Sequence, residues 1–221
     1  MRLFQFAFLF SLIYSQYHSS EWGTITSLLT PTGIKATDEG LIYASTSGGL
    51  LAFNPEFEEF NFIKREEGLE YLDLASISID NHGRIWLGGA NPKGCLQVYD
   101  PEIGLVKYFE DDFIVSIDKI QIDEDIAFAI YNGSTSSEIG ILEFQIDPDG
   151  LPNYRDYYTN FTSLIVSEIH DLDIFQNSVY VTTNQGIFVG NISDNLKFLE
   201  NWNEVYIGSD AKQFLPGDFP I

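Results

Sequence analysis

The chain has 221 residues and a formal net charge of −22, from 33 acidic and 11 basic side chains. A surface this acidic repels a phosphate backbone and anionic lipid, so it disfavours nucleic-acid binding and adhesion to charged membranes. Hydrophobic residues make up 44% of the sequence, which is enough for a packed core and excludes a disordered chain.

The single cysteine, Cys95, excludes an intrachain disulfide and a cysteine zinc cluster. We interpret it as a small buried apolar residue on a strand rather than as a nucleophile.

The first 15 residues have the layout of a secretory signal peptide. Arg2 supplies a positive charge, Leu3 to Tyr14 are almost wholly apolar, and Ser15 is a small residue at the expected cleavage point. The apolar stretch is short for a membrane span. We therefore expect a secreted, periplasmic or cell-surface protein without a membrane span, cleaved near Ser15. The alternative is a buried first strand or helix.

Residues 75–101 contain three short apolar runs separated by turns, the pattern of a β-meander. The middle run, Ile85 to Leu87, lies between the turn at 80–83 and the pair Gly88-Gly89. Partial copies of this unit recur along the chain. We take these residues as equivalent: Ile42, Ile85, Ile126 and Val179. The steps between positions 42, 85, 126 and 179 are 43, 41 and 53 residues.

Each unit also has an apolar run before the meander and an aromatic run after it, which makes four strands. A period of about 40–50 residues with four strands is typical of a propeller blade. The sequence therefore predicts an all-β fold, a β-propeller with about four antiparallel four-stranded blades. An aromatic side chain recurs beside the equivalent positions, and we expect it to pack between blades rather than to bind sugar. These residues are Tyr43, Trp86, Phe128 and Tyr180.

The predicted organisation is one repeat domain with short flanking segments. A signal peptide at 1–15 precedes a strand segment at 16–32, which holds Trp22 and is expected to complete the last blade. The blades occupy 33–207, and the tail at 208–221 is too short for another blade. Propellers have about 4–8 blades, so we expect an incomplete or N-terminal part of a larger propeller. A free-standing four-blade ring is the alternative.

Few residues suggest catalysis. His170 and Asp171 are adjacent on an expected innermost strand and could orient a base. A propeller-type lyase or glycoside hydrolase would need at least two of Asp80, Asp123 and Asp171, or His170, to converge in one pocket. No serine or cysteine partner stands at a recognised spacing. We therefore expect no catalytic residues.

Two acidic turns, 123–125 and 147–150, carry oxygen ligands of the kind that Ca²⁺ prefers. The second lacks the later ligands and the closing glutamate of a calcium loop. Aspartate and glycine are also ordinary turn residues, and we interpret both segments as turns. No metal or cofactor site is predicted.

The second unit resembles the propeller repeat of two-component-regulator sensor ectodomains. The matching residues are Asp80, Gly83, Ile85, Trp86, Leu87, Gly88, Gly94, Tyr99 and Asp100. From Trp22 to Ile207 the layout also resembles the N-terminal propeller of PorZ-like proteins of the type IX secretion system. This resemblance implies an exported, non-enzymatic propeller associated with the cell surface and with secreted cargo or surface lipopolysaccharide.

We therefore expect an exported binding or scaffold module that is not an enzyme, with a protein or a surface glycan or lipopolysaccharide as its partner. One alternative is the sensor ectodomain of a two-component regulator. The other is a propeller-type lyase or glycoside hydrolase.

Overall fold

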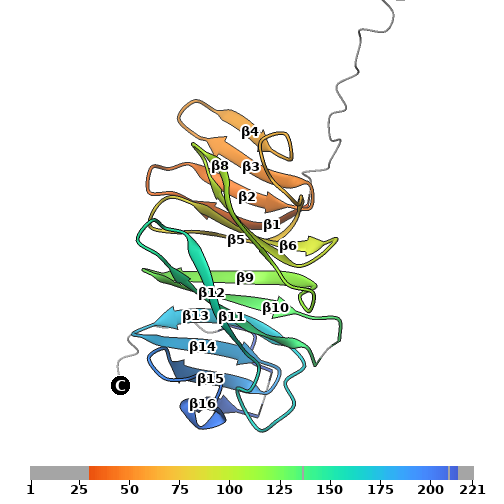
Figure 1. The fold of residues 1–221 in the computed structure, drawn as a ribbon, viewed down its shortest axis with the longest axis vertical. Helices are drawn as coiled ribbons and strands as arrows, with labels where there is room; N and C mark the ends of the chain where they lie inside the picture. The colour runs from red at the N-terminus through yellow and green to blue at the C-terminus, as the bar shows by residue number, and fades with distance from the viewer. Residues whose placement is uncertain (1–29, 136, 209, 214–221) are drawn as a thin grey trace, which may run out of the picture.

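The computed structural model describes residues 30–135, 137–208 and 210–213. These residues form four sheets, each with four antiparallel strands in sequential order. Figure 1 shows the sheets following one another along the long axis, with β1–β4 at one end and β13–β16 at the other. The predicted all-β fold of four-stranded blades is confirmed, and the four blades do not close into a ring.

We number the blades in chain order. Blade 1 consists of β1 (Pro31–Ala36), β2 (Ile42–Thr46), β3 (Gly49–Asn54) and β4 (Glu59–Ile63). Blade 2 consists of β5 (Asp73–Ile79), β6 (Ile85–Asn91), β7 (Cys95–Asp100) and β8 (Gly104–Glu110). Blade 3 consists of β9 (Ser116–Asp123), β10 (Ile126–Asn132), β11 (Ile139–Ile146) and β12 (Pro152–Tyr158). Blade 4 consists of β13 (Ile169–Phe175), β14 (Ser178–Thr183), β15 (Gly186–Asn191) and β16 (Trp202–Ile207), with a short 3-10 helix, Leu199–Asn201, before its last strand.

Local turn chemistry sets the register of the hairpins. In blade 2 the carboxylate of Asp80 accepts hydrogen bonds from the backbone N–H groups of His82 (2.9 Å) and Arg84 (3.0 Å). Such bonds from the backbone to a side chain satisfy N–H groups that have no partner on a neighbouring strand. They stabilise the turn in which the chain reverses direction. The turn places Ile79 opposite Ile85.

In blades 1 and 4 a glycine begins the third strand, at a point where the fourth strand passes close to it. A Cβ atom on Gly49 would lie 2.7 Å from the carbonyl oxygen of Ile63, and the φ angle of Gly49 is +129°. Gly186 has a φ of +140° and faces the carbonyl oxygen of Tyr206 in the same way. Only glycine fits this close backbone approach without strain.

Neighbouring blades bury apolar side chains between their facing sheets, which makes three core clusters. The recurring aromatic residue lies on the face toward the following blade and is buried in blades 1 to 3, with Tyr43 4% exposed and Trp86 and Phe128 0% exposed. Tyr180 in blade 4 is only half-buried. The predicted packing between blades is thus confirmed for the first three aromatic residues.

Hydrogen bonds between innermost strands also join the blades. The hydroxyl of Thr32 in blade 1 donates to the carbonyl oxygen of Leu74 in blade 2 (2.8 Å). The hydroxyl of Ser76 in blade 2 donates to the carbonyl oxygen of Ile117 in blade 3 (2.7 Å). The repeat therefore recurs in the contacts between blades as well as in the strands.

One predicted equivalence was wrong by one residue. Ile85 packs in the cluster between blades 1 and 2 and so faces the preceding blade. Ile126 packs in the cluster between blades 3 and 4, whereas Ala127 faces blade 2. Ala127 is therefore the counterpart of Ile85. A shift of one residue exchanges the two faces of a strand, and the run from Ile126 to Ile130 has no polar residue to mark either face.

The signal peptide at 1–15 and residues 16–29 of the predicted strand segment lie outside the described residues, as do 209 and 214–221 of the tail. The first strand begins at Pro31. Within the described part of the chain, no helix has the length and apolar character needed to cross a membrane.

Candidate functional site

Two neighbouring grooves lie at one end of blades 1 to 3. In each antiparallel blade, the turn between strands one and two and the turn between strands three and four lie at the same end. We call this end the loop face; in blades 1 to 3 it includes the turns 37–41, 80–84, 100–103, 124–125 and 147–151. The first groove, between blades 1 and 2, has a volume of about 780 Å³, and the second, between blades 2 and 3, about 790 Å³. Asn81 and His82 line both and so separate them.

The first groove is acidic. It is lined by the carboxylate residues Asp38, Glu39, Asp80, Asp100 and Glu102. The guanidinium of Arg84 lies beside it and pairs with Asp100, with 3.4 Å from Nε to Oδ2. The surplus of carboxylates gives the groove a negative potential, which attracts cationic groups and repels anionic ones.

Asp80 has a structural role in blade 2. Its side chain is buried, and Oδ2 accepts a hydrogen bond of 2.8 Å from the indole Nε1 of Trp86. Its Oδ1 atom accepts the two backbone bonds of the turn. Both oxygens are therefore engaged in holding the turn and the indole.

The three aspartates considered for catalysis are separated. Asp171 is buried near the start of β13, where it forms an ion pair with Lys119 of blade 3 and accepts a bond from the backbone N–H of Leu172 (3.0 Å). Asp123 is exposed at the end of β9. Asp80 directly follows the last residue of β5. Neither Asp123 nor Asp171 lines a groove of the loop face. Of these three aspartates only Asp80 lines one of the two grooves, so the convergence of Asp80, Asp123 and Asp171 that the enzyme hypothesis required is not found there.

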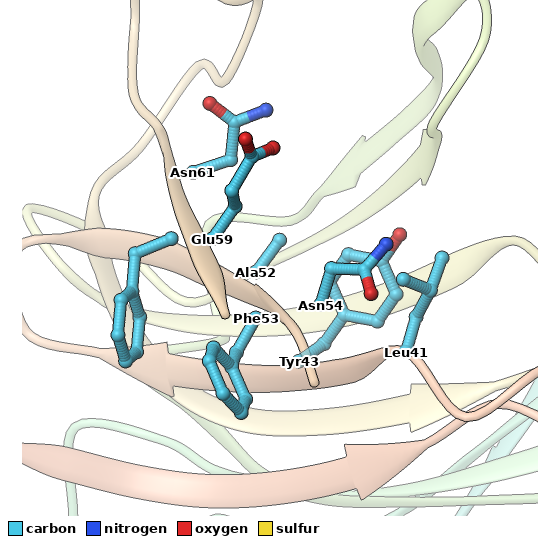
Figure 2. A pocket seen from close by; sticks show the side chains of 8 residues that line it. Leu41, Tyr43, Ala52, Phe53, Asn54, Glu59 and Asn61 are labelled. Carbon is cyan, nitrogen blue, oxygen red and sulfur yellow. The ribbon is translucent and has the colours of Figure 1, made fainter. Parts of the chain in front are cut away.

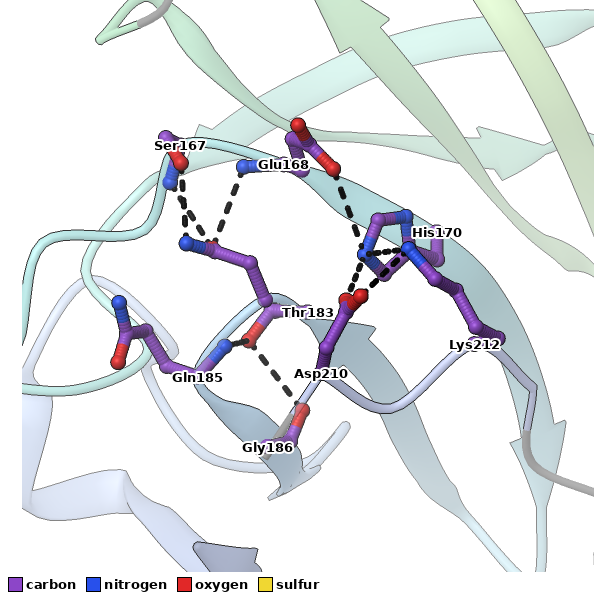
Figure 3. Close-up of polar contacts among 9 residues, drawn as sticks. Ser167, Glu168, His170, Thr183, Gln185, Gly186, Asp210 and Lys212 are labelled. Carbon is purple, nitrogen blue, oxygen red and sulfur yellow. Dashed lines mark hydrogen bonds and ion pairs between the residues drawn. The ribbon is translucent and has the colours of Figure 1, made fainter. Parts of the chain in front are cut away.

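His170 contacts the segment after β16 (Figure 3). Its Nε2 atom lies 2.6 Å from Oδ1 of Asp210 and 3.6 Å from Oε2 of Glu168. The ammonium of Lys212 lies 2.7 Å from Asp210, and the hydrogen bond from Lys212, together with that from His170, lowers the pKa of Asp210. Sequence reasoning paired His170 with Asp171 and missed Asp210, because a contact across 40 residues leaves no periodic signal.

The two acidic turns are held by their own hydrogen bonds. The carboxylate of Asp147 accepts bonds from the backbone N–H groups of Asp149 (3.0 Å) and Leu151 (2.8 Å), and the bond from Leu151 is the main cause of its lowered pKa. The side chain of Asp125 accepts a bond of 2.9 Å from Gln145. Among the residues that the structure describes, no three histidine, cysteine, aspartate or glutamate side chains gather as a metal site.

The acidic turn at 147–150 also joins two blades. Nη1 of Arg84 donates a hydrogen bond of 2.6 Å to the carbonyl oxygen of Asp149, so blade 2 and blade 3 are tied together at the loop face. The wall between the two grooves is therefore fixed by contacts within and between blades.

Cys95 is buried on β7, as predicted. Burial raises the pKa of its thiol to about 12. A thiol with this pKa holds almost no thiolate at neutral pH, so it is not a nucleophile there.

A third hollow, of about 360 Å³, lies on blade 1 (Figure 2). Phe53 on β3 and Phe60 on β4 stack there with ring centroids 4.5 Å apart, beside the polar side chains of Asn54 and Glu59. Blade 1 thus presents aromatic surface at the end of the molecule.

No family model matches the chain, and no curated protein matches it. Several solved structures are similar to it in fold. One is PorZ, a bacterial surface component of the type IX secretion system of Porphyromonas gingivalis, with 17% identity, a TM-score of 0.57, and coverage of 77% of this chain and 26% of that chain. Another is the extracellular domain of a putative one-component system from B. thetaiotaomicron, with 14% identity, a TM-score of 0.52, and coverage of 86% and 23%.

A gluconolactonase from Xanthomonas campestris is also similar, with 11% identity, a TM-score of 0.52, and coverage of 73% of this chain and 58% of that chain. The chain spans only a part of each of these proteins. At such identities the likeness concerns the fold. It confirms the resemblance that the second unit and the layout predicted: this is a propeller-type module similar in structure to PorZ and to sensor ectodomains.

Proposed function

We propose that this chain is exported and acts as a non-enzymatic binding or scaffold module at the cell surface, in a role like that of PorZ in type IX secretion. The observation that carries the proposal is the structural match to PorZ over 77% of this chain. The leader-like residues 1–15 support export, and the separation of Asp80, Asp123 and Asp171 supports a role in binding.

The loop face is the proposed binding surface. Its two grooves are formed by short turns held by hydrogen bonds, so their shape is fixed before a partner arrives, which lowers the entropic cost of binding. The carboxylates of Asp38, Glu39 and Glu102 favour a partner with lysine or arginine side chains. Of the two expected partners, a basic protein segment therefore fits this face better than lipopolysaccharide, whose phosphates are anionic.

Charge reversal tests the surface. We expect the double variant Asp38→Lys, Glu102→Lys to weaken binding of a lysine-rich cargo peptide by at least about tenfold, because it removes the attraction in the first groove. The matched control is Asp194→Lys, Glu200→Lys, which changes the same charge on exposed residues of blade 4. Equal losses in both variants, or binding to lipopolysaccharide alone, would exclude the groove as a site for a basic segment.

The secretion role has its own test. In the organism that encodes the chain, deletion of the gene should leave type IX cargo in the periplasm, and the wild-type chain should restore secretion. Normal secretion in the deletion strain would exclude this role.

The similarity to the extracellular domain from B. thetaiotaomicron supports a second candidate, the sensor ectodomain of a two-component regulator. That function requires a membrane span and a kinase domain in the same gene product. Sequencing the transcript on both sides of the region that encodes these residues distinguishes the two proposals.

A further inference from the structure

A buried tyrosine lines the first groove of the loop face. The side chain of Tyr43 is 4% exposed, and it lines both this groove and the hollow on blade 1. Figure 2 shows its ring among the side chains that line the hollow. Because Tyr43 belongs to both linings, the groove and the hollow meet at this side chain.

The hydroxyl of Tyr43 makes no hydrogen bond to any residue that the structure describes, and its neighbours Tyr99 and Glu39 act on it only electrostatically. Among residues 30–135, 137–208 and 210–213, the only fully enclosed side-chain oxygen or nitrogen without a partner belongs to Thr182. The oxygen of Tyr43 is therefore not fully enclosed and can be reached from the groove that its side chain lines. Buried polar groups normally have a hydrogen-bond partner, so an unpaired one beside a groove indicates a place for a ligand.

The first groove is apolar next to this hydroxyl and acidic at its rim. Leu41 and Ile79 line it and pack in the same cluster as Tyr43. The exposed carboxylates of Glu39 and Glu102 lie at the rim, and no ion pair between described residues engages either of them. A side chain with an aliphatic stem and a cationic end fits this arrangement, because the stem can lie on apolar surface while the cation meets carboxylates.

The buried hydroxyl favours a guanidinium over an ammonium as the cationic end. A guanidinium presents several N–H donors in a planar fork, so it can donate to a phenol oxygen and to a carboxylate at once. It is also more weakly hydrated than an ammonium, so it loses water beside a buried group more readily. Burial, followed by the charges of Tyr99 and Glu39, raises the pKa of Tyr43, so its hydroxyl keeps its proton at neutral pH. The oxygen then accepts from the guanidinium while the proton is free to reach a carboxylate.

We propose that the first groove is a recognition site for an arginine side chain of the protein partner. The aliphatic part of this arginine lies on Leu41 and Ile79, and its guanidinium donates to the hydroxyl oxygen of Tyr43 and to the carboxylate of Glu39. The inference rests on the proposed function, because it names the residue type that the basic segment places in this groove.

Removal of one hydroxyl from the full chain tests the site. The probe is a short capped peptide of alternating arginine and serine, and calorimetry measures its binding. Tyr43→Phe should raise the dissociation constant at least about tenfold, because a hydrogen bond to a charged group is lost. The variant should be no less stable to urea than the wild type, since the hydroxyl has no bond in the folded chain.

Tyr99→Phe is the matched control. Tyr99 is 7% exposed and packs in the same cluster as Tyr43, but it does not line the first groove. This variant should bind the peptide as the wild type does. Wild-type binding by Tyr43→Phe, or equal losses in the two variants, would overturn the arginine site.

Peptides of equal length test the chemistry of the ligand. Lysine in place of arginine keeps the charge, and citrulline keeps the shape but removes the charge. The arginine peptide should bind at least about tenfold more tightly than either. Equal binding of the lysine peptide would overturn recognition of the guanidinium, and equal binding of the citrulline peptide would overturn the need for a cation.

A charge-neutralising pair separates local recognition from the overall charge. Glu39→Gln alters the first groove and should raise the dissociation constant of the arginine peptide about threefold or more. Glu124→Gln alters the second groove by the same charge and should have no effect. Equal effects would show that the peptide responds only to net charge and would overturn the site.

The outcome for this site is distinguishable from the outcome for the proposed function. If Asp38→Lys, Glu102→Lys weakens binding and Tyr43→Phe does not, the groove still binds a basic segment and only the arginine site is overturned. If the charge reversal has no more effect than its control on blade 4, the groove is excluded for any basic segment, and the arginine site is excluded with it.

Discussion

Blade 2 and blade 4 carry an aromatic residue at the same position of the repeat, yet the two residues have different surroundings. Trp86 is fully buried, makes an edge-to-face contact with Phe144 of blade 3 (centroids 6.2 Å apart), and donates its indole N–H to Asp80. Tyr180 is half-buried on the face of blade 4 that looks away from blade 3. The difference teaches that a blade does not bury its own aromatic residue; the following blade does.

The largest expected effect comes from removing the better-packed of these two residues. Trp86→Ala should lower the free energy of unfolding by about 3–5 kcal/mol, because it leaves a cavity between blades 2 and 3. Tyr180→Ala should cost about 1 kcal/mol or less, since its surroundings are partly solvent. Urea unfolding followed by circular dichroism measures both. Similar losses in the two variants would contradict the view that the following blade provides the burial.

The next effect concerns the carboxylate that holds the indole. Asp80→Ala should cost about 2–3 kcal/mol, because it leaves the indole N–H and two backbone N–H groups without their acceptor. The exposed Asp123 provides the control, and Asp123→Ala should change stability by less than about 0.5 kcal/mol. If the two variants unfold at the same urea concentration, the bonds of Asp80 add nothing to stability.

A smaller effect should appear in alkali, and it should arise in the interior blades rather than in blade 4. Burial raises the pKa of Cys95, Tyr131 and Tyr154 to about 12, from ordinary values of 9.0 for the thiol and 10.0 for the phenols. The unfolded chain loses these protons first, so the folded state binds more protons and its stability falls as the pH rises from about 9 to 12.

Two measurements check the alkaline prediction. Thermal unfolding should shift to lower temperature across this range, and the shift should shrink in Cys95→Ala. Reaction of the native thiol with a disulfide reagent at neutral pH should be slow and should become fast on unfolding. A rapid reaction in the native state would show that the thiol of Cys95 is accessible.

The smallest effect is expected at the end of blade 4. Asp210→Asn removes the ion pair with Lys212, which is exposed to solvent and therefore weak, and alters the contact with His170. We expect no measurable change in global unfolding but faster hydrogen exchange at the amide of Ala211, which donates to the carbonyl oxygen of Thr183 (3.1 Å). Because the pKa of Asp210 is lowered in the folded chain, the wild type should lose this protection as the pH falls below the ordinary aspartate range. Unchanged exchange in the variant would mean that the backbone bond alone holds the segment.

Residue patterns within single repeats were enough to predict the blades. Turn residues such as those at 80–83 and the recurring aromatic residues act within one hairpin or one repeat, so their spacing carries the information that the fold needs. The error at Ile126 has the same origin, because a strand of apolar residues only does not mark which face it turns to which neighbour.

The grooves of the loop face and the bond between His170 and Asp210 became visible only once the sheets were placed in space. Both features depend on residues tens of positions apart in the sequence. Periodic patterns report local alternation of polar and apolar residues, whereas these contacts depend on how whole sheets stack, and stacking leaves no repeat in the sequence of any single blade.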